Sequence, residues 1–146
     1  MIRPRRLTPP TAPGAMLKRF DAPSVRPRKT DDDRDPDYLA QVRQMPCLKC
    51  VCEPCGEAAH VRIASATFGK ASGMGKTPPD RWAVPLCASC HRLARDAQHT
   101  KGEALFWAGT GINVLIVCVQ LYAQRGNLAA MRLTVLLAAA TRRASP

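Results

Sequence analysis

The sequence predicts a small α+β domain held together by metal-bound cysteines, and three observations lead to this prediction. Two Cys-x2-Cys pairs stand 36 residues apart. Short segments between them alternate apolar and polar residues as β-strands do. The last third of the chain is apolar and is interrupted by helix-ending residues. A length of 146 residues suits one such domain rather than two.

The N-terminal residues 1–36 are expected to form a disordered basic arm. They contain seven of the thirteen prolines and nine Lys or Arg, and they lack apolar periodicity. We expect the arm either to contact phosphate groups or to be an inert tail.

The elements expected after the arm follow from apolar periodicity and from Gly and Pro boundaries. The predicted strands are 58–65 and 81–86. The predicted helices are 35–46, 90–99, 102–112, 112–124 and 128–143, and Gly126-Asn127 separates the last two.

The chain is strongly basic, with a formal net charge of +11 and a pI near 9.9. Residues 38–146 alone carry 13 Lys or Arg against 5 Asp or Glu. This excess predicts nucleic acid as the partner, and ordinary solubility charge is the alternative. No export signal is visible, and the longest apolar run, Val114–Val119, is too short to span a bilayer. We therefore expect a cytoplasmic protein, no membrane and reduced cysteines.

Clustered cysteines in a reducing compartment favour metal binding. Four thiolates in two Cys-x2-Cys pairs predict a closed tetrahedral Zn²⁺ site with structural ligands Cys47, Cys50, Cys87 and Cys90. Cys52 and Cys55 form a competing pair. Because Cys50 and Cys52 would crowd one site, Cys52 is expected to lie outside it. Cys118 is expected to be a core residue.

Two superficial motif matches are rejected. The stretch CASCH, 87–91, fits a c-type haem attachment site, but such haem is attached after export and would leave the first cysteine pair without a role. Gly75-Lys76-Thr77 resembles the end of a phosphate-binding loop, but Lys70 stands where the first glycine is required.

The three histidines all lie between residues 60 and 99. His60 lies on a predicted strand, His91 lies in a predicted helix directly after the second cysteine pair, and Asp80 lies in the loop between them. A hairpin followed by a helix could hold one divalent cation. In this context the stretches PCLKC, EAAHVR, GMGKTPPDRWAVPLCASCH and HTKGEALFW, within 46–107, resemble the HNH endonucleases with their ββα-metal (His-Me finger) core. The resemblance is to small phage and prophage proteins of the YbcO-like and Ref-like kind.

The resemblance implies a zinc-stapled ββα-metal domain over 37–112, with C-terminal helices 113–146 packed on it. It implies a DNA endonuclease in which His60 is the general base, Asp80 orients the hairpin, and His91 and His99 bind Mg²⁺ or another divalent cation. The candidate phosphate contacts are Arg62, Arg81, Arg92 and Arg95, and the alternative for each is a solvated surface charge.

The chain departs from the family pattern at two positions. Ala59 precedes the base where the family usually has a metal ligand, and Arg95 stands where the second helix histidine is usual. His99 would lie about 80° round an ideal helix from His91, so it reaches the cation only if the helix bends or ends. The alternative to a nuclease is a non-catalytic zinc module that binds nucleic acid or a recombination partner.

Overall fold

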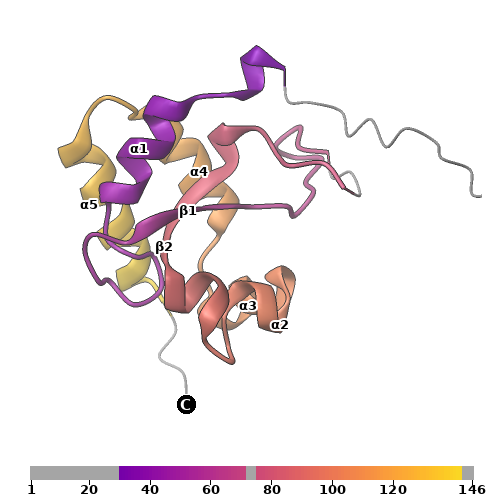
Figure 1. Cartoon of the computed structure of the whole chain (residues 1–146), viewed down its shortest axis with the longest axis vertical. Coiled ribbons are helices and arrows are strands. Elements are labelled where there is room, and N and C mark those ends of the chain that lie inside the picture. Colours follow the sequence, from indigo (N-terminus) through magenta and orange to yellow (C-terminus); the bar gives the residue numbers. More distant parts are fainter. Residues whose placement is uncertain (1–29, 72–74, 143–146) are drawn as a thin grey trace, which may run out of the picture.

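The computed structural model describes residues 30–71 and 75–142. This part contains five α-helices and one two-stranded antiparallel sheet, so the α+β prediction is confirmed (Figure 1). The predicted basic arm lies outside the described residues except for its last seven. In Figure 1 the two strands cross the middle of the molecule, and α2 and α3 lie together at the lower end of the view.

The sheet pairs β1 (Gly56–His60) with β2 (Ala83–Cys87). Gly56 lies opposite Cys87 and His60 opposite Ala83, so the register places the cysteines at one end of the sheet and His60 at the other. Strand β2 begins two residues later than predicted, after a 3-10 turn over Asp80–Trp82.

Strand β1 begins earlier than predicted and ends at His60 instead of residue 65. One further backbone bond joins the Val61 N–H to the Trp82 carbonyl at 2.8 Å. Beyond it, the N–H groups of Arg62 and Ile63 donate to the carboxylate of Glu103, at 2.7 and 3.2 Å. The strand ends because a side chain takes the donors that a longer ladder would use.

Helix α1 (Pro36–Gln44) confirms the helix predicted over 35–46. The side chain of Asp35 caps it by accepting from the Tyr38 N–H, and proline occupies the first turn, where no N–H is needed. Tyr38 and Val42 are fully buried, and the Tyr38 hydroxyl donates to the Ala83 carbonyl at 3.0 Å. Burial raises the pKa of Tyr38 well above its ordinary value, so this hydroxyl stays protonated. The helix is thereby fixed to the sheet.

The single helix predicted over 90–99 is wrong. A five-residue π-helical turn, Ser89–Leu93, is followed by a separate short helix α2 (Gln98–Lys101) and then α3 (Glu103–Thr110). The chain leaves helical geometry at Ala94 and again at Ala97, whose ψ angles are 157°. Ala97 is fully buried and Gln98 is 2 % exposed. The extended backbone at Ala94 and Ala97 breaks the predicted helix, and the segment that follows the first break buries Ala97 and Gln98.

The C-terminal part forms α4 (Val114–Ala123) and α5 (Leu128–Ala140). Asn113 and Asn127 cap them with their side chains, and the predicted boundary at Gly126-Asn127 is confirmed. Helix α4 packs on β2 and on the 3-10 turn and supplies Cys118 and Leu121 to the core. Among the described residues no single helix is long and apolar enough to cross a membrane. Helices α3 and α4 taken together are long and apolar enough to cross a membrane, but they are bent by 86° at the break between them.

Candidate metal centre and histidine cleft

Four cysteine sulfurs gather beside the end of the sheet. The Sγ atoms of Cys47, Cys50, Cys52 and Cys87 all lie within 4.8 Å of one another. The Cys50 sulfur is 3.3 Å from that of Cys52 and 3.6 Å from that of Cys87. Thiolates at such spacing could hold a metal ion, and the set is consistent with structural zinc.

Backbone hydrogen bonds shape the loop that carries three of these cysteines. The Leu48 N–H donates to the Pro85 carbonyl at 2.9 Å, which fixes the loop to β2. The Cys47 N–H donates to the Cys52 carbonyl, and the Val51 N–H donates to the Cys47 carbonyl, each at 2.8 Å. Val51 adopts a φ of 65°, a left-handed conformation unusual for a β-branched residue. This turn returns Cys52 to the side of Cys50.

Three of the predicted ligands, Cys47, Cys50 and Cys87, come together as expected, and the fourth member of the close group is Cys52. Cys90 lies beside this group, and its backbone N–H donates to the Cys87 Sγ at 3.5 Å. Cys52 was expected to lie outside the site because neighbouring ligands would be crowded, but its sulfur lies 3.3 Å from that of Cys50, across the left-handed turn at Val51.

The remaining cysteines lie in or near the core. Cys90 is buried, and this burial raises the pKa of its thiol. The nearby Cys47 and the thiols of Cys87 and Cys50 raise this pKa further. Cys55 is buried, and its thiol donates to the Val42 carbonyl at 3.4 Å and to the Glu57 carbonyl at 3.3 Å. Cys118 is fully buried, as predicted.

The thiol of Cys50 is unusually acidic. Partial burial acts to raise its pKa, but hydrogen bonds from the Cys52 backbone and from the thiols of Cys52, Cys47 and Cys87 lower it to about 7. A thiol must lose its proton before it binds a metal, so this group is suited to metal binding near neutral pH.

At the other end of the sheet, His60 forms a pair with Asp80. The His60 Nε2 lies 2.9 Å from the Asp80 Oδ1, and Asp80 is only 5 % exposed. The second carboxylate oxygen of Asp80 accepts from the Asp35 N–H at 2.9 Å. Asp80 therefore joins the end of β1 to the start of α1, and it holds the imidazole in one orientation.

The other two histidines stack on each other. The ring centroids of His91 and His99 are 4.5 Å apart, with 68° between the ring planes. The break in the predicted helix explains this contact, because the chain turns back after Leu93 and returns His99 to the ring of His91. Partial burial, then positive charge on His91 and Arg62, holds the pKa of His99 below its ordinary value. A neutral imidazole is the form that binds metals.

Sequence analysis missed Glu57, which holds His91 in place. The Glu57 Oε2 lies 2.7 Å from the His91 Nδ1, and the other oxygen accepts from the Arg92 guanidinium at 2.7 and 3.0 Å. The guanidinium of Arg92, followed by His91, lowers the pKa of Glu57. Glu57 acts on His91 across 34 residues, so no local sequence pattern indicated it.

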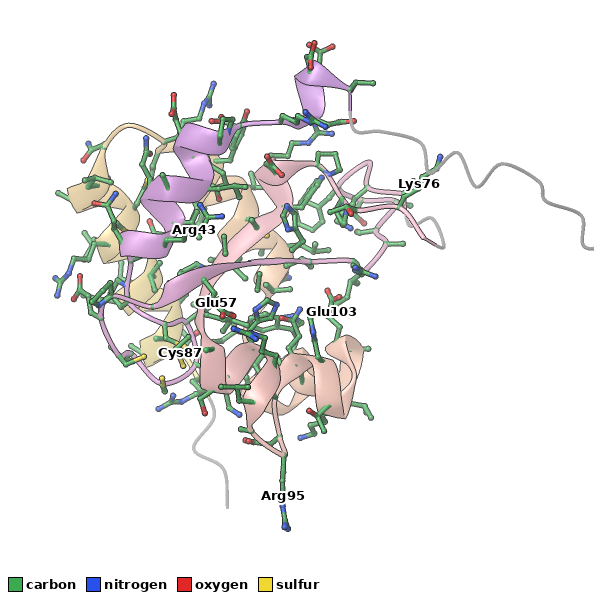
Figure 2. The ribbon with its side chains drawn as sticks, viewed as in Figure 1. Arg43, Glu57, Lys76, Cys87, Arg95 and Glu103 are labelled. Atoms are coloured by element: carbon green, nitrogen blue, oxygen red, sulfur yellow. The ribbon has the colours of Figure 1, made fainter. Side chains whose placement is uncertain are left out.

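A cleft of about 430 Å³ lies beside the histidines, lined by His60, Arg62, Gln98, His99, Gly102 and Glu103. Glu103 was also missed by sequence analysis. Its carboxylate fixes the chain just after His60 and thereby forms one wall of the cleft. Figure 2 shows Glu57 and Glu103 on the side of the molecule where the strands face α2 and α3.

The four predicted arginines are dispersed. Arg62 lines the histidine cleft and a neighbouring hollow of about 240 Å³ that Lys76 also lines. Arg92 is paired with Glu57. Arg95 points away from the body of the protein (Figure 2). Arg81 lines a separate, largely apolar hollow. Of the four, Arg62 alone lines the histidine cleft in the described part of the chain.

Across residues 30–71 and 75–142, only the cysteines form a group of three or more His, Cys, Asp or Glu ligands close enough for one ion. His91 and His99 therefore supply two candidate ligands to a cation, without a third protein ligand at that spacing. Comparison with family models, with curated proteins and with solved structures gave no significant match to this chain.

Proposed function

We propose that the chain is a metal-dependent endonuclease of the HNH type that hydrolyses phosphodiester bonds in DNA. Its role would be phage or prophage recombination or DNA processing in the cytoplasm of a bacterial cell. The observation that carries the proposal is the contact of His60 with the buried Asp80, 2.9 Å apart, where His60 lines a cleft that His99 also lines. The structural zinc of the family corresponds to the thiol group at the opposite end of the sheet.

In the proposed reaction His60 is the general base. The Asp80 carboxylate accepts the hydrogen bond from Nε2, so Nδ1 is the basic nitrogen of the ring. The imidazole removes a proton from the water molecule that attacks phosphorus. Asp80 keeps the ring oriented and stabilises the imidazolium that forms. Base catalysis of this kind contributes about 10² to 10⁴-fold to the rate.

His91 and His99 are the residues that would hold the divalent cation. Because the His91 Nδ1 contacts Glu57, its Nε2 is the nitrogen available for a metal. The cation supplies charge neutralisation at the scissile phosphate. Two imidazoles suit Mn²⁺ or another transition-metal ion better than Mg²⁺, which prefers oxygen ligands. Water or phosphate oxygens would have to supply the remaining ligands, since Ala59 has no ligand atom.

The net charge of +11 supports a nucleic acid substrate. Arg62 lines both the histidine cleft and the hollow that contains Lys76, so the two hollows share one guanidinium. A phosphate backbone that runs across both would be contacted by Arg62 next to the base and by Lys76 farther along.

A second candidate function is a non-catalytic zinc module that binds nucleic acid or a recombination partner. The observation that favours it is the pair of histidines without a third described ligand within metal-binding distance. Such a module retains the thiol site and the basic charge, and it needs no reaction at His60.

Plasmid nicking separates the two functions. Purified zinc-bound protein is incubated with supercoiled DNA and with RNA across a range of Mn²⁺ and Mg²⁺ concentrations, and binding is measured in the same samples. The nuclease proposal expects metal-dependent nicking, more efficient with Mn²⁺ than with Mg²⁺. Binding without nicking under every divalent ion favours the zinc module.

A further inference from the structure

The outward face of α4 and α5 carries large apolar side chains. Ile116 is 43 % exposed, Leu133 57 % and Leu137 60 %. Helix α4 contains no charged residue, and α5 contains only Arg132. Exposure of this much apolar surface in neighbouring helices is typical of an interaction site.

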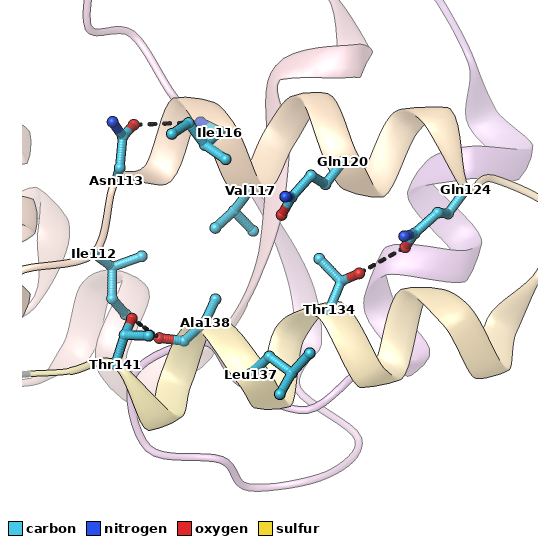
Figure 3. A pocket seen from close by; sticks show the side chains of 10 residues that line it. All are labelled: Ile112, Asn113, Ile116, Val117, Gln120, Gln124, Thr134, Leu137, Ala138 and Thr141. Carbon is cyan, nitrogen blue, oxygen red and sulfur yellow. Dashed lines mark hydrogen bonds between the residues drawn. The ribbon is translucent and has the colours of Figure 1, made fainter.

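A groove of about 340 Å³ runs between the two helices on this face (Figure 3). Ile112, Ile116, Val117, Leu137 and Ala138 provide its apolar lining. Polar residues also line it, namely Asn113, Gln120, Gln124, Thr134 and Thr141. An apolar centre with uncharged polar groups around it resembles the composition of protein–protein interfaces.

Two of the charges next to this face are paired within the chain. Arg132 makes a two-pronged contact with Glu53, with a shortest distance of 2.8 Å. Arg125 lies 3.8 Å from Asp35, and its guanidinium lies 4.3 Å from the centre of the Tyr122 ring. Both arginines between residues 114 and 140 therefore face acidic groups from other parts of the fold.

We propose that a second copy of this chain docks on the α4–α5 face to form a two-fold symmetric dimer. Two chains of charge +11 repel each other, and the repulsion is smallest where a neutral face meets a neutral face. A nucleic acid or an acidic protein needs basic groups, and none of the described residues that line the groove is charged. Leu137 lines the groove, and the exposed Leu133 lies one helical turn before it on α5, so one patch contains both projecting apolar side chains and a recess. A two-fold interface requires such a self-complementary patch.

The test is the mass of the full-length zinc-bound protein, measured by sedimentation equilibrium over a wide concentration range. We expect a dimer that Leu137→Glu weakens at least tenfold. The matched control is Leu105→Glu on α3, because Leu105 is similarly exposed at 64 % and lies outside the groove; this variant should remain dimeric. Raising the salt concentration should strengthen the dimer, since salt screens the repulsion between the copies. The same rise in salt concentration should weaken the affinity for nucleic acid.

Leu133→Lys provides a second variant in case Leu137→Glu does not fold, and circular dichroism establishes folding for each. A wild-type protein that is monomeric at every concentration would overturn the proposal. If that monomer floats with neutral lipid vesicles, the α4–α5 face binds a membrane instead. A dimer whose affinity is unchanged by both Leu137→Glu and Leu133→Lys would also overturn the proposal. So would a dimer that Leu105→Glu weakens as much as these variants do. None of these outcomes depends on nuclease activity.

Discussion

Replacing Glu57 with Gln tests whether this carboxylate prepares His91 for a cation. Glu57 holds the His91 Nδ1 at 2.7 Å, and the two side chains are 23 % and 16 % exposed. A charge-assisted bond in such a partly buried place contributes about 1.5–3 kcal/mol. The pairing with Arg92, which is 55 % exposed, contributes little because solvent screens it. Loss of a partner that orients a metal-binding histidine typically weakens metal affinity about 10- to 100-fold.

The assay is a titration of DNA-free protein with Mn²⁺, in which electron paramagnetic resonance measures the unbound ion. Glu57→Gln should raise the Mn²⁺ dissociation constant by about 10- to 100-fold. The zinc content should not change, because no cysteine is altered. Glu53→Gln is the matched control, since Glu53 also binds an arginine through both oxygens but contacts no histidine among the described residues. Equal Mn²⁺ affinities for the two variants would refute the proposed role of Glu57.

Two further predictions concern the thiol group. Cys52→Ser should release zinc to a chromophoric chelator faster than Cys90→Ser does, because the Cys52 sulfur belongs to the close group of four; the reverse order would restore the two-pair ligand set. Val51→Gly should stabilise the zinc-bound protein by about 0.5–1 kcal/mol, since glycine avoids the left-handed strain of about 1–2 kcal/mol but loses more chain entropy. Thermal unfolding measures this, and a lower midpoint for Val51→Gly would count against strain at that residue.

The cysteine cluster could largely be predicted from the sequence because local spacing determines which thiols can share an ion. Three of the four expected sulfurs come together. Cys52 could not be assigned, because its position depends on the left-handed turn at Val51, and a β-branched residue gives no signal for that conformation.

The three histidines and Asp80 could be picked out from the sequence, but their arrangement could not. The proximity of His60 and Asp80 follows from a hairpin, and the structure has them in contact. The stacking of His99 on His91 depends on a break in the chain at Ala94 and Ala97. Alanine favours helix, so the local sequence predicts no break there, and burial of the segment overrides that preference.

The carboxylates around the cleft were missed for a different reason. Glu57 and Glu103 act across 34 and 41 residues of sequence, on His91 and on the Arg62 backbone. Such long-range pairs leave no periodic signal in a single sequence. Glu103 also sets the end of β1, which explains why that strand boundary was wrong.

Single-turnover cleavage of DNA by wild type and His60→Ala at saturating Mn²⁺ tests the proposed function most directly, with DNA affinity measured on the same samples. The account predicts that wild type cuts, and that His60→Ala binds DNA equally well but cuts about 10² to 10⁴-fold more slowly. Under the same account, extra Mn²⁺ partly restores His91→Ala but leaves His60→Ala slow. A wild-type protein that never cuts, or a His60→Ala variant that cuts at the wild-type rate, would contradict it.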